Sequence, residues 1–311
     1  CDCCGDFGET VVFGDNDEGK ILDLSGKTFD HYRYVLELMS LLLDRRYSNL
    51  DNPNENLCWL FDSKDFTKAK NKPLYKSAPA RCYREGGYTL LRSKSRKILI
   101  GIDHADLGFG SLAAHGHADA LSFQMFVNGK PIFCDPGTYN YHISKKLRDN
   151  FRKTQYHNTV CIDNKDQSQM LGAFLWGRKA QCRLTMLKDG EQEVELSAEQ
   201  NGYAPVSVAR RFHFNRENEL SVTDILKGTA EGFGTFVFSP DCTLEITGKN
   251  TAEVETSSSK ICIEFYGNVE LSAITVPYSE SYCKMTETKA LRYSFCVNKA
   301  IAIKTSFKIS E

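Results

Sequence analysis

After residue 80 the chain is a succession of short runs rich in β-branched and aromatic residues, and this pattern constrains the fold more than any other feature. About a dozen such runs can be marked, separated by Gly, Asn and Asp. The Asn-Gly pair at 128–129 predicts a tight hairpin turn. Because no long helical pattern interrupts these runs, we predict a mainly β fold, a large antiparallel β-sandwich.

The N-terminal part has a different periodicity. Residues 30–47 predict a helix with one buried face, formed by apolar residues at steps of three and four: Val35, Leu36, Met39, Leu42 and Leu43. Asp30 is the candidate N-cap of this helix. Residues 57–61 predict a short helix or turn that packs on it.

Residues 63–80 are rich in Lys, Ala, Ser and Pro, show little periodicity and indicate a linker. We therefore divide the chain into a helical part (residues 1–65), a linker (66–80) and a β-sandwich domain (81–311). The helical part is too small to hold a good core alone, so we expect it to be the end of a larger helical domain.

Composition excludes only a few functions. The net charge of −1 gives no global basic field for nucleic acid, although a local basic cluster could bind an acidic ligand. No apolar run is long enough to span a membrane, and no signal peptide opens the chain. Most of the 12 cysteines lie singly in apolar runs, where free Cys acts as a small hydrophobic residue, and the CDCC start lacks zinc-finger spacing.

The stretch HGHADALSF, residues 115–123, concentrates chemically active side chains. If it begins a strand, His115 and His117 share one face, because side chains alternate with period two. Asp135 lies in a DPG turn that ends a later strand, and His157 precedes another. Neighbouring strands could bring His117, Asp135 and His157 together as ligands of zinc or a similar divalent metal. The alternative is that each His is a hydrogen-bonded core residue, and periodicity does not decide which of the first two binds the metal.

Several motifs in the same order carry a family resemblance: HGHADALSF (115–123), NGKPIFCDPGTYNY (128–141), RDNFRKTQYHNTVCIDNKDQS (148–168), GAFLWGRKA (172–180) and RRFHFNRENELSVTDIL (210–226). Together they resemble the C-terminal domain of the heparinase II/III family of polysaccharide lyases. VFGDNDEGKILDL (12–24) resembles the segment near the end of that family's helical toroid. The resemblance implies an (α/α) toroid followed by an antiparallel β-sandwich, with an active site between them that cleaves uronic-acid polysaccharides by β-elimination.

The resemblance also assigns roles to the site residues. It implies that His115 is a catalytic histidine that faces the substrate. His117, Asp135 and His157 would bind a structural divalent metal, with zinc the first choice. Asp119 or Asn158 could support these ligands through a second layer of hydrogen bonds, or could equally serve as strand-end hydrogen-bonding residues.

Tyr141 and Arg152 are the candidate substrate-binding residues, since arginine offers a carboxylate a planar fork of donors. Tyr139 is expected to pack under the turn instead, and Arg148 and Lys153 are weaker candidates in a charged run. Residues 15–17 (DND) lack the glutamate that a calcium loop needs at its twelfth position, so a turn at the rim of the cleft is the preferred interpretation.

β-Elimination needs a group that neutralises the uronate carboxylate, a base that removes the C5 proton and an acid for the leaving oxygen. In the family the base tyrosine and the neutralising residue come from the toroid, upstream of the segment that residues 12–24 resemble; Tyr32 and Tyr34 do not match them. We therefore expect negligible lyase activity from this chain alone. The expected partners are an anionic polysaccharide and the missing toroid, and the family suggests a periplasmic or secreted bacterial protein.

Two alternatives remain at this point. The sandwich could be a non-catalytic carbohydrate-binding or structural module that a metal stabilises. A stand-alone metal enzyme built on HGH and a later histidine would need an open coordination position.

Overall fold

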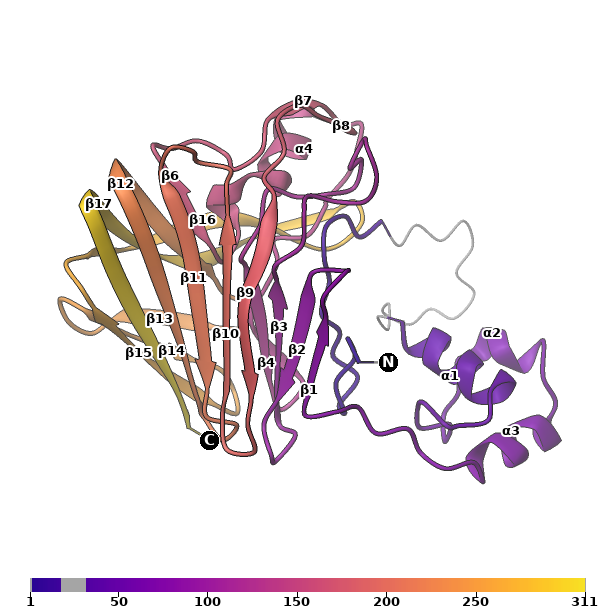
Figure 1. Cartoon of the computed structure of the whole chain (residues 1–311). Coiled ribbons are helices and arrows are strands. Elements are labelled where there is room, and N and C mark those ends of the chain that lie inside the picture. The colour runs from indigo at the N-terminus through magenta and orange to yellow at the C-terminus, as the bar shows by residue number, and fades with distance from the viewer. Residues whose placement is uncertain (1, 18–31, 311) are drawn as a thin grey trace.

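The computed structural model describes residues 2–17 and 32–310, and it places a small helical part beside a large β domain (Figure 1). The helical part contains α1 (Arg33–Leu42), α2 (Glu55–Cys58) and α3 (Ser63–Lys70). None of the helices in the described residues is long and apolar enough to cross a membrane.

The first sheet has five antiparallel strands in chain order: β1 (Ala80–Tyr83), β2 (Tyr88–Arg92), β3 (Ile98–Asp103), β4 (Phe123–Val127) and β5 (Lys130–Phe133). Asn128 and Gly129 join β4 to β5, and both have positive φ angles, 50° and 75°. Positive φ at both central residues is what a type I′ hairpin turn needs, so the predicted hairpin is confirmed.

The second sheet is larger, and its main path runs β13-β14-β15-β17-β12-β11-β10-β9, with β16 and β6 paired at its side. Its strands are β6 (Val160–Ile162), β9 (Cys182–Asp189), β10 (Val194–Gln200), β11 (Ser207–Phe214), β12 (Glu219–Val237), β13 (Thr243–Ile246), β14 (Thr251–Glu255), β15 (Lys260–Tyr266), β16 (Glu270–Ser281) and β17 (Lys284–Ser310). Between β5 and β9 the chain forms α4 (Lys145–Arg152), a 3₁₀ turn (Thr154–Tyr156) and a small hairpin of β7 (Met170–Gly172) and β8 (Leu175–Trp176).

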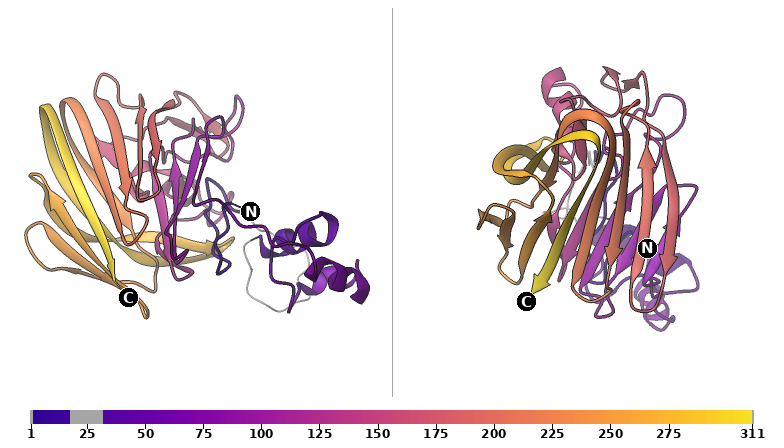
Figure 2. Two further views of the ribbon diagram at one scale, coloured as in Figure 1. Left: turned by 60° about the horizontal axis from the view of Figure 1, so that its bottom comes forward. Right: turned by 60° about the vertical axis from the view of Figure 1, so that its left-hand side comes forward.

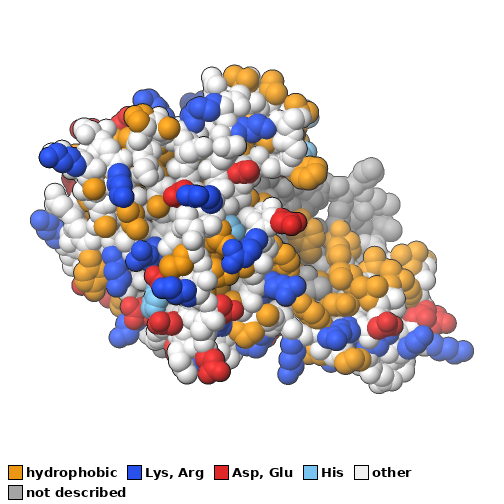
Figure 3. Space-filling model, in the orientation of Figure 1, with side chains coloured by type: hydrophobic (Ala, Val, Ile, Leu, Met, Phe, Trp, Pro, Cys, Tyr) orange, Lys and Arg blue, Asp and Glu red, His pale blue; other side chains and the backbone are white. Residues whose placement is uncertain are grey.

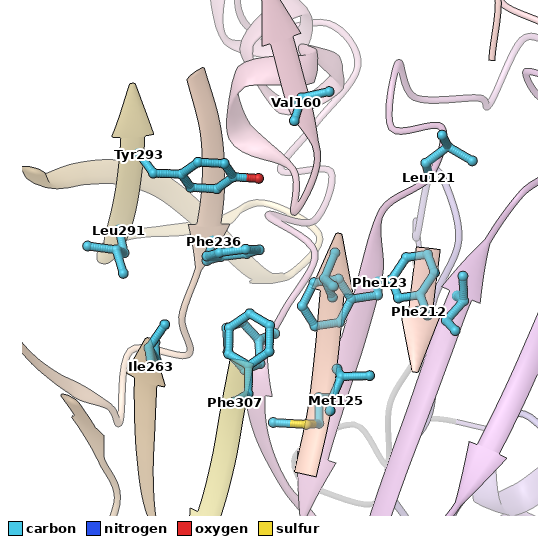
Figure 4. Packing of buried hydrophobic residues seen from close by; sticks show 14 of the residues in the cluster. Leu121, Phe123, Met125, Val160, Phe212, Phe236, Ile263, Leu291, Tyr293 and Phe307 are labelled. Carbon is cyan, nitrogen blue, oxygen red and sulfur yellow. The ribbon is translucent and has the colours of Figure 1, made fainter. Parts of the chain in front are cut away.

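The two sheets face each other across an aromatic core (Figures 2 and 4). Phe123 of β4 and Phe133 of β5 meet Phe236 of β12 and Phe307 of β17, with ring centroids 5.0 Å apart for Phe133 and Phe307 and 5.9 Å for Phe123 and Phe236. Alternate residues of each strand point into this layer, as the period-two pattern requires. The predicted antiparallel β-sandwich is confirmed.

The helical part differs from the prediction in two places. Within the described residues the predicted helix at 30–47 extends only over Arg33–Leu42, and its candidate cap Asp30 lies outside them. The predicted linker at residues 63–80 is wrong in its first part, because α3 occupies Ser63–Lys70. Asp62 and Asp65 form a capping box there, in which each side chain accepts a hydrogen bond from the other's backbone N–H.

Residues 2–17, here called the N-terminal strap, pack on the outer face of the first sheet. Val11 fills a small apolar cluster with Leu90, Leu99 and Phe126. The side chain of Gln124 exchanges two hydrogen bonds with the backbone of Val12. The division drawn from the sequence places these residues in the helical part, whereas the strap lies on the sandwich and α1 to α3 lie apart from it (Figure 1).

Candidate metal and histidine site

The predicted site residues come from three segments at one end of the sandwich. His115 and His117 lie in the loop between β3 and β4, and not in a strand, because β4 begins only at Phe123. The alternation argument for their common face is therefore wrong, although both side chains reach one carboxylate. Asp135 follows β5 directly, and His157 lies between the 3₁₀ turn and β6.

Four side chains form a buried cluster of potential metal ligands: His117, Asp119, Asp135 and His157. One ligand atom from each lies within 4.8 Å of all the others. The Nδ1 of His117 is 3.1 Å from the Nε2 of His157, which is 3.3 Å from a carboxylate oxygen of Asp135. The predicted trio is thus brought together, and Asp119 joins it.

The outer contacts of the two rings decide which nitrogens face the cluster. The Nδ1 of His157 lies 2.7 Å from the carbonyl oxygen of Lys153, which can only accept, so this nitrogen carries the proton. The Nε2 of His117 lies 3.0 Å from a carboxylate oxygen of Asp15 and is protonated for the same reason. The other nitrogen of each ring points inward, beside two carboxylates. This nitrogen and oxygen donor set fits zinc or a similar divalent ion.

Electrostatics in the cluster favour positive charge. Burial lowers the pKa of His157, but the carboxylates of Asp135 and Asp119 outweigh it and raise the pKa to about 9. Burial and the charge of Asp119 raise the pKa of the neighbouring Asp103 well above its usual range. A cation would therefore compete with a proton for the His157 ring.

A single buried carboxylate, Asp15 of the strap, connects the cluster to the surface. One oxygen accepts from the Nε2 of His117 at 3.0 Å, and the other accepts from the Nδ1 of His115 at 3.1 Å. The guanidinium of Arg148 on α4 donates to both oxygens. Burial raises the pKa of Asp15, but the hydrogen bonds and charges of His117 and Arg148 hold it at about 2.

His115 is the exposed member of the site: its side chain is 62% exposed, against 1% for Asp15. Tyr141 and Phe174 form an aromatic wall beside it, with centroids 6.0 Å and 5.7 Å from the imidazole. His115 also lines a cavity of about 410 Å³, together with Phe13 and Gly14 of the strap and Tyr88. An exposed imidazole beside an aromatic wall and a cavity can exchange a proton with a bound molecule.

Comparison with known families assigns the β domain. The model of the heparinase II/III-like C-terminal domain matches residues 76–306. The chain belongs to this family. No curated protein matches the chain.

Solved structures resemble the heparinase II/III-like chain over most of its length. Heparan sulfate lyase HepC from Pedobacter heparinus has a TM-score of 0.74 and 15% identity, covering 100% of this chain and 45% of its own. A heparinase III with methylated lysines has a TM-score of 0.74 and 14% identity, covering 99% and 44%. A further heparinase III has a TM-score of 0.65 and 15% identity, covering 82% and 41%. The likeness establishes the fold, and the chain spans less than half the length of these proteins.

The position of Arg152 in the heparinase II/III-like domain does not agree with a substrate-binding role. Its guanidinium is fully buried, donates to Asp149 and to the carbonyl of Gly172, and lies 4.9 Å from the Trp176 ring centroid. Arg148, one helical turn earlier, is equally buried and is the arginine that reaches the site. Tyr141 does lie beside His115, and its contact with substrate stays a prediction.

Asn158 and Tyr139 have structural positions. The Asn158 amide donates to the carbonyls of Phe123 and Cys134 and accepts from the backbone N–H of Val237, so it has the strand-linking role. Tyr139 packs on Phe151 of α4, as expected for a residue under the turn.

Asp15 is a residue of the candidate site that the sequence does not reveal. The sequence places its segment at the rim of the cleft, whereas its carboxylate is 1% exposed at the centre of the site. The only signal was its place in the GDND motif, 100 residues from His115. Spacing alone could not reveal a contact that depends on how the strap lies on the sheet.

Proposed function

We propose that the heparinase II/III-like domain is the sandwich part of a polysaccharide lyase that cleaves uronic-acid-containing polysaccharides by β-elimination. The observation that carries the proposal is the exposed imidazole of His115, held by the buried carboxylate of Asp15 beside an aromatic wall. Glycosaminoglycans are the first substrates to test, because the structures similar to this chain include a heparan sulfate lyase.

In this reaction a base removes the C5 proton, the C4–O bond breaks, a C4–C5 double bond forms and the leaving oxygen takes up a proton. With its Nδ1 bonded to Asp15, His115 has Nε2 available for a proton transfer or a hydrogen bond to the sugar. Tyr141 and Phe174 would support the face of a sugar ring. The remaining groups would come from a helical domain of the same polypeptide.

A helical partner is supported by the surface of the helical part. Leu42, Trp59 and Leu60 are 65%, 78% and 72% exposed, and apolar side chains cover much of this part in Figure 3. Exposed apolar area of this kind is typical of an interaction surface. We propose that it packs against further helices, which would also form the other wall of the cleft.

We further propose that His117, Asp119, Asp135 and His157 hold a divalent metal, zinc in the first place, with a structural role. The four ligands come from the loop before β4, the end of β5 and the segment before β6. When bound, the ion would supply a fixed crosslink between these segments. Asp15 would then orient His117 from outside, as carboxylates commonly do for metal-binding histidines.

The test is a lyase assay that follows absorbance near 232 nm, where the unsaturated uronate absorbs. It is run on the 311-residue chain and on the full product of its gene, with heparan sulfate, chondroitin sulfate and alginate. We expect turnover of at least one polymer by the full product and negligible turnover by the 311-residue chain.

Two variants of the full product test whether turnover depends on the site residue His115. His115→Ala should abolish turnover, whereas His213→Ala, on the exposed face of β11 beside Glu193, should leave it unchanged. Turnover that survives His115→Ala would refute the assignment of this residue. Binding of a polymer with no turnover by the full product would favour a carbohydrate-binding module instead.

A further inference from the structure

The surroundings of Asp15 restrict the protons on two histidines at once. Its two oxygens receive four donors: the imidazoles of His115 and His117 and the two terminal nitrogens of Arg148. An ionised carboxylate can only accept hydrogen bonds, so each ring must donate through the nitrogen that faces it. That nitrogen is Nδ1 in His115 and Nε2 in His117.

We propose that Asp15 is a positioning residue that fixes opposite tautomers in the two histidines, Nδ1–H in His115 and Nε2–H in His117. In the neutral form of His115 the consequence is an Nε2 without a proton, on a side chain that is 62% exposed. The consequence for His117 is an unprotonated Nδ1 that points into the cluster with His157. The tautomers follow from contacts of this chain alone, and only the value for catalysis rests on the proposed function.

The backbone of the strap also contacts the backbone of the loop that carries His115. The backbone N–H of Asp15 donates to the carbonyl oxygen of His115 at 2.9 Å, so the two residues are bonded through both main chain and side chain. Gly14 has φ +67°, and a Cβ there would lie 2.4 Å from the same carbonyl oxygen. Glycine is thus required where the strap meets the histidine loop. The next residue, Asn16, donates its N–H to Thr138 at 2.7 Å and fixes the end of the turn.

A purely structural ion pair would not need the histidines. Arg148 alone offers Asp15 a bidentate partner, and the other deeply buried pair in the described residues, Arg210 with Asp224, is completed by a tyrosine and backbone carbonyls. An imidazole that is 62% exposed could instead bond to water in any orientation. Its bond to a carboxylate gives it one orientation and one tautomer, as in the aspartate–histidine pairs of hydrolases.

The test is nitrogen-15 NMR of the 311-residue chain labelled at histidine, recorded at pH 8 with and without zinc. Long-range proton–nitrogen correlations distinguish the two neutral tautomers, because the ring nitrogen without a proton has a characteristic nitrogen-15 chemical shift. His115→Ala and His117→Ala assign the signals. We expect a bare Nε2 for His115 and a protonated Nε2 for His117; the opposite pattern in the wild-type chain would overturn the proposal.

Asp15→Asn provides the perturbation, and Asp6→Asn is the matched control on the same strap, where the carboxylate pairs with Arg96 at the surface. Each oxygen of Asp15 accepts from one imidazole and one guanidinium nitrogen, and the asparagine side chain presents an amide donor in place of one oxygen, so the two donors on that oxygen lose their acceptor. His115 is the exposed donor, so water can replace its hydrogen bond at the least cost in free energy. We expect its Nε2 to become protonated, the preference of free histidine in water, and no change in Asp6→Asn; an unaltered His115 in folded Asp15→Asn would count against the proposal.

Activity of the full gene product separates this inference from the proposed function. If that product is a lyase, Asp15→Asn should lower kcat by about 10²-fold, with a much smaller effect on KM. An unchanged kcat would overturn the positioning role. A wild-type product without lyase activity would refute the proposed function and leave the tautomer assignment intact.

Discussion

Asn158 allows a quantitative prediction, because its amide ties three strands together beneath the site. It donates to the carbonyls of Phe123 on β4 and Cys134 after β5, at 2.7 Å and 3.0 Å. It accepts from the N–H of Val237 on β12 at 2.6 Å. The two sheets of the sandwich are thereby joined by one side chain, next to His157 and close to Asp135.

Asn158→Ala leaves one buried donor and two buried acceptors without this partner. Each buried polar group that loses its hydrogen bond costs about 1–3 kcal/mol, and a water molecule in the vacated space would recover part of this. We expect the free energy of unfolding to fall by about 3–4 kcal/mol. The two metal-ligand segments would also lose their common support, so zinc affinity should fall as well.

Urea unfolding followed by intrinsic fluorescence, in the presence of a chelator, measures the loss as a shift in midpoint at constant slope. Asn218→Ala is the matched control, since that exposed amide makes one hydrogen bond to the carbonyl of Ile309 near the end of β17, and a loss of about 1 kcal/mol is expected. A loss below about 1 kcal/mol in Asn158→Ala would refute the reasoning that buried backbone groups depend on this side chain.

Three further predictions follow from other contacts. Tyr293→Phe removes the hydroxyl that donates to Asp224 at 2.6 Å and should cost about 1.5–3 kcal/mol of unfolding free energy, measured in urea. The pKa of Asp15 is about 2, below the ordinary 3.8, so its contribution to the free energy of unfolding is complete above about pH 4 and is lost as pH falls toward 2. In Asp15→Asn the urea midpoint should therefore depend less on pH between about pH 4 and 3. Zinc at about 100 times its dissociation constant should stabilise the chain by about 2.7 kcal/mol, measured as a rise in the melting temperature that EDTA reverses. His157→Ala should abolish this rise.

The parts of the fold that depend on local patterns could be predicted from sequence. The hairpin at Asn128 and Gly129 needed only two residues that adopt positive φ. The approach of His117, Asp135 and His157 followed from neighbouring segments within one stretch of the β domain.

Predictions failed where a contact depends on packing between distant segments. Asp15 reaches His115 only because the strap lies across the first sheet. The sequence predicts a substrate contact for Arg152 and gives Arg148 as a weaker candidate in a charged run, but the two lie one turn apart on α4 and both face inward. The capping box at Asp62 marks the start of α3, but a prediction from apolar periodicity does not detect a polar signal of this kind.

The strap also has a mechanical consequence. The helices α1 to α3 are joined to the sandwich at both ends, through the strap before them and through β1 after them. A body on two covalent anchors can twist or tilt, but it cannot swing as freely as one on a single linker. The first of these attachments contains Asp15, whose carboxylate accepts a hydrogen bond from His115, so the chain that leads to the helices also supplies a residue of the site.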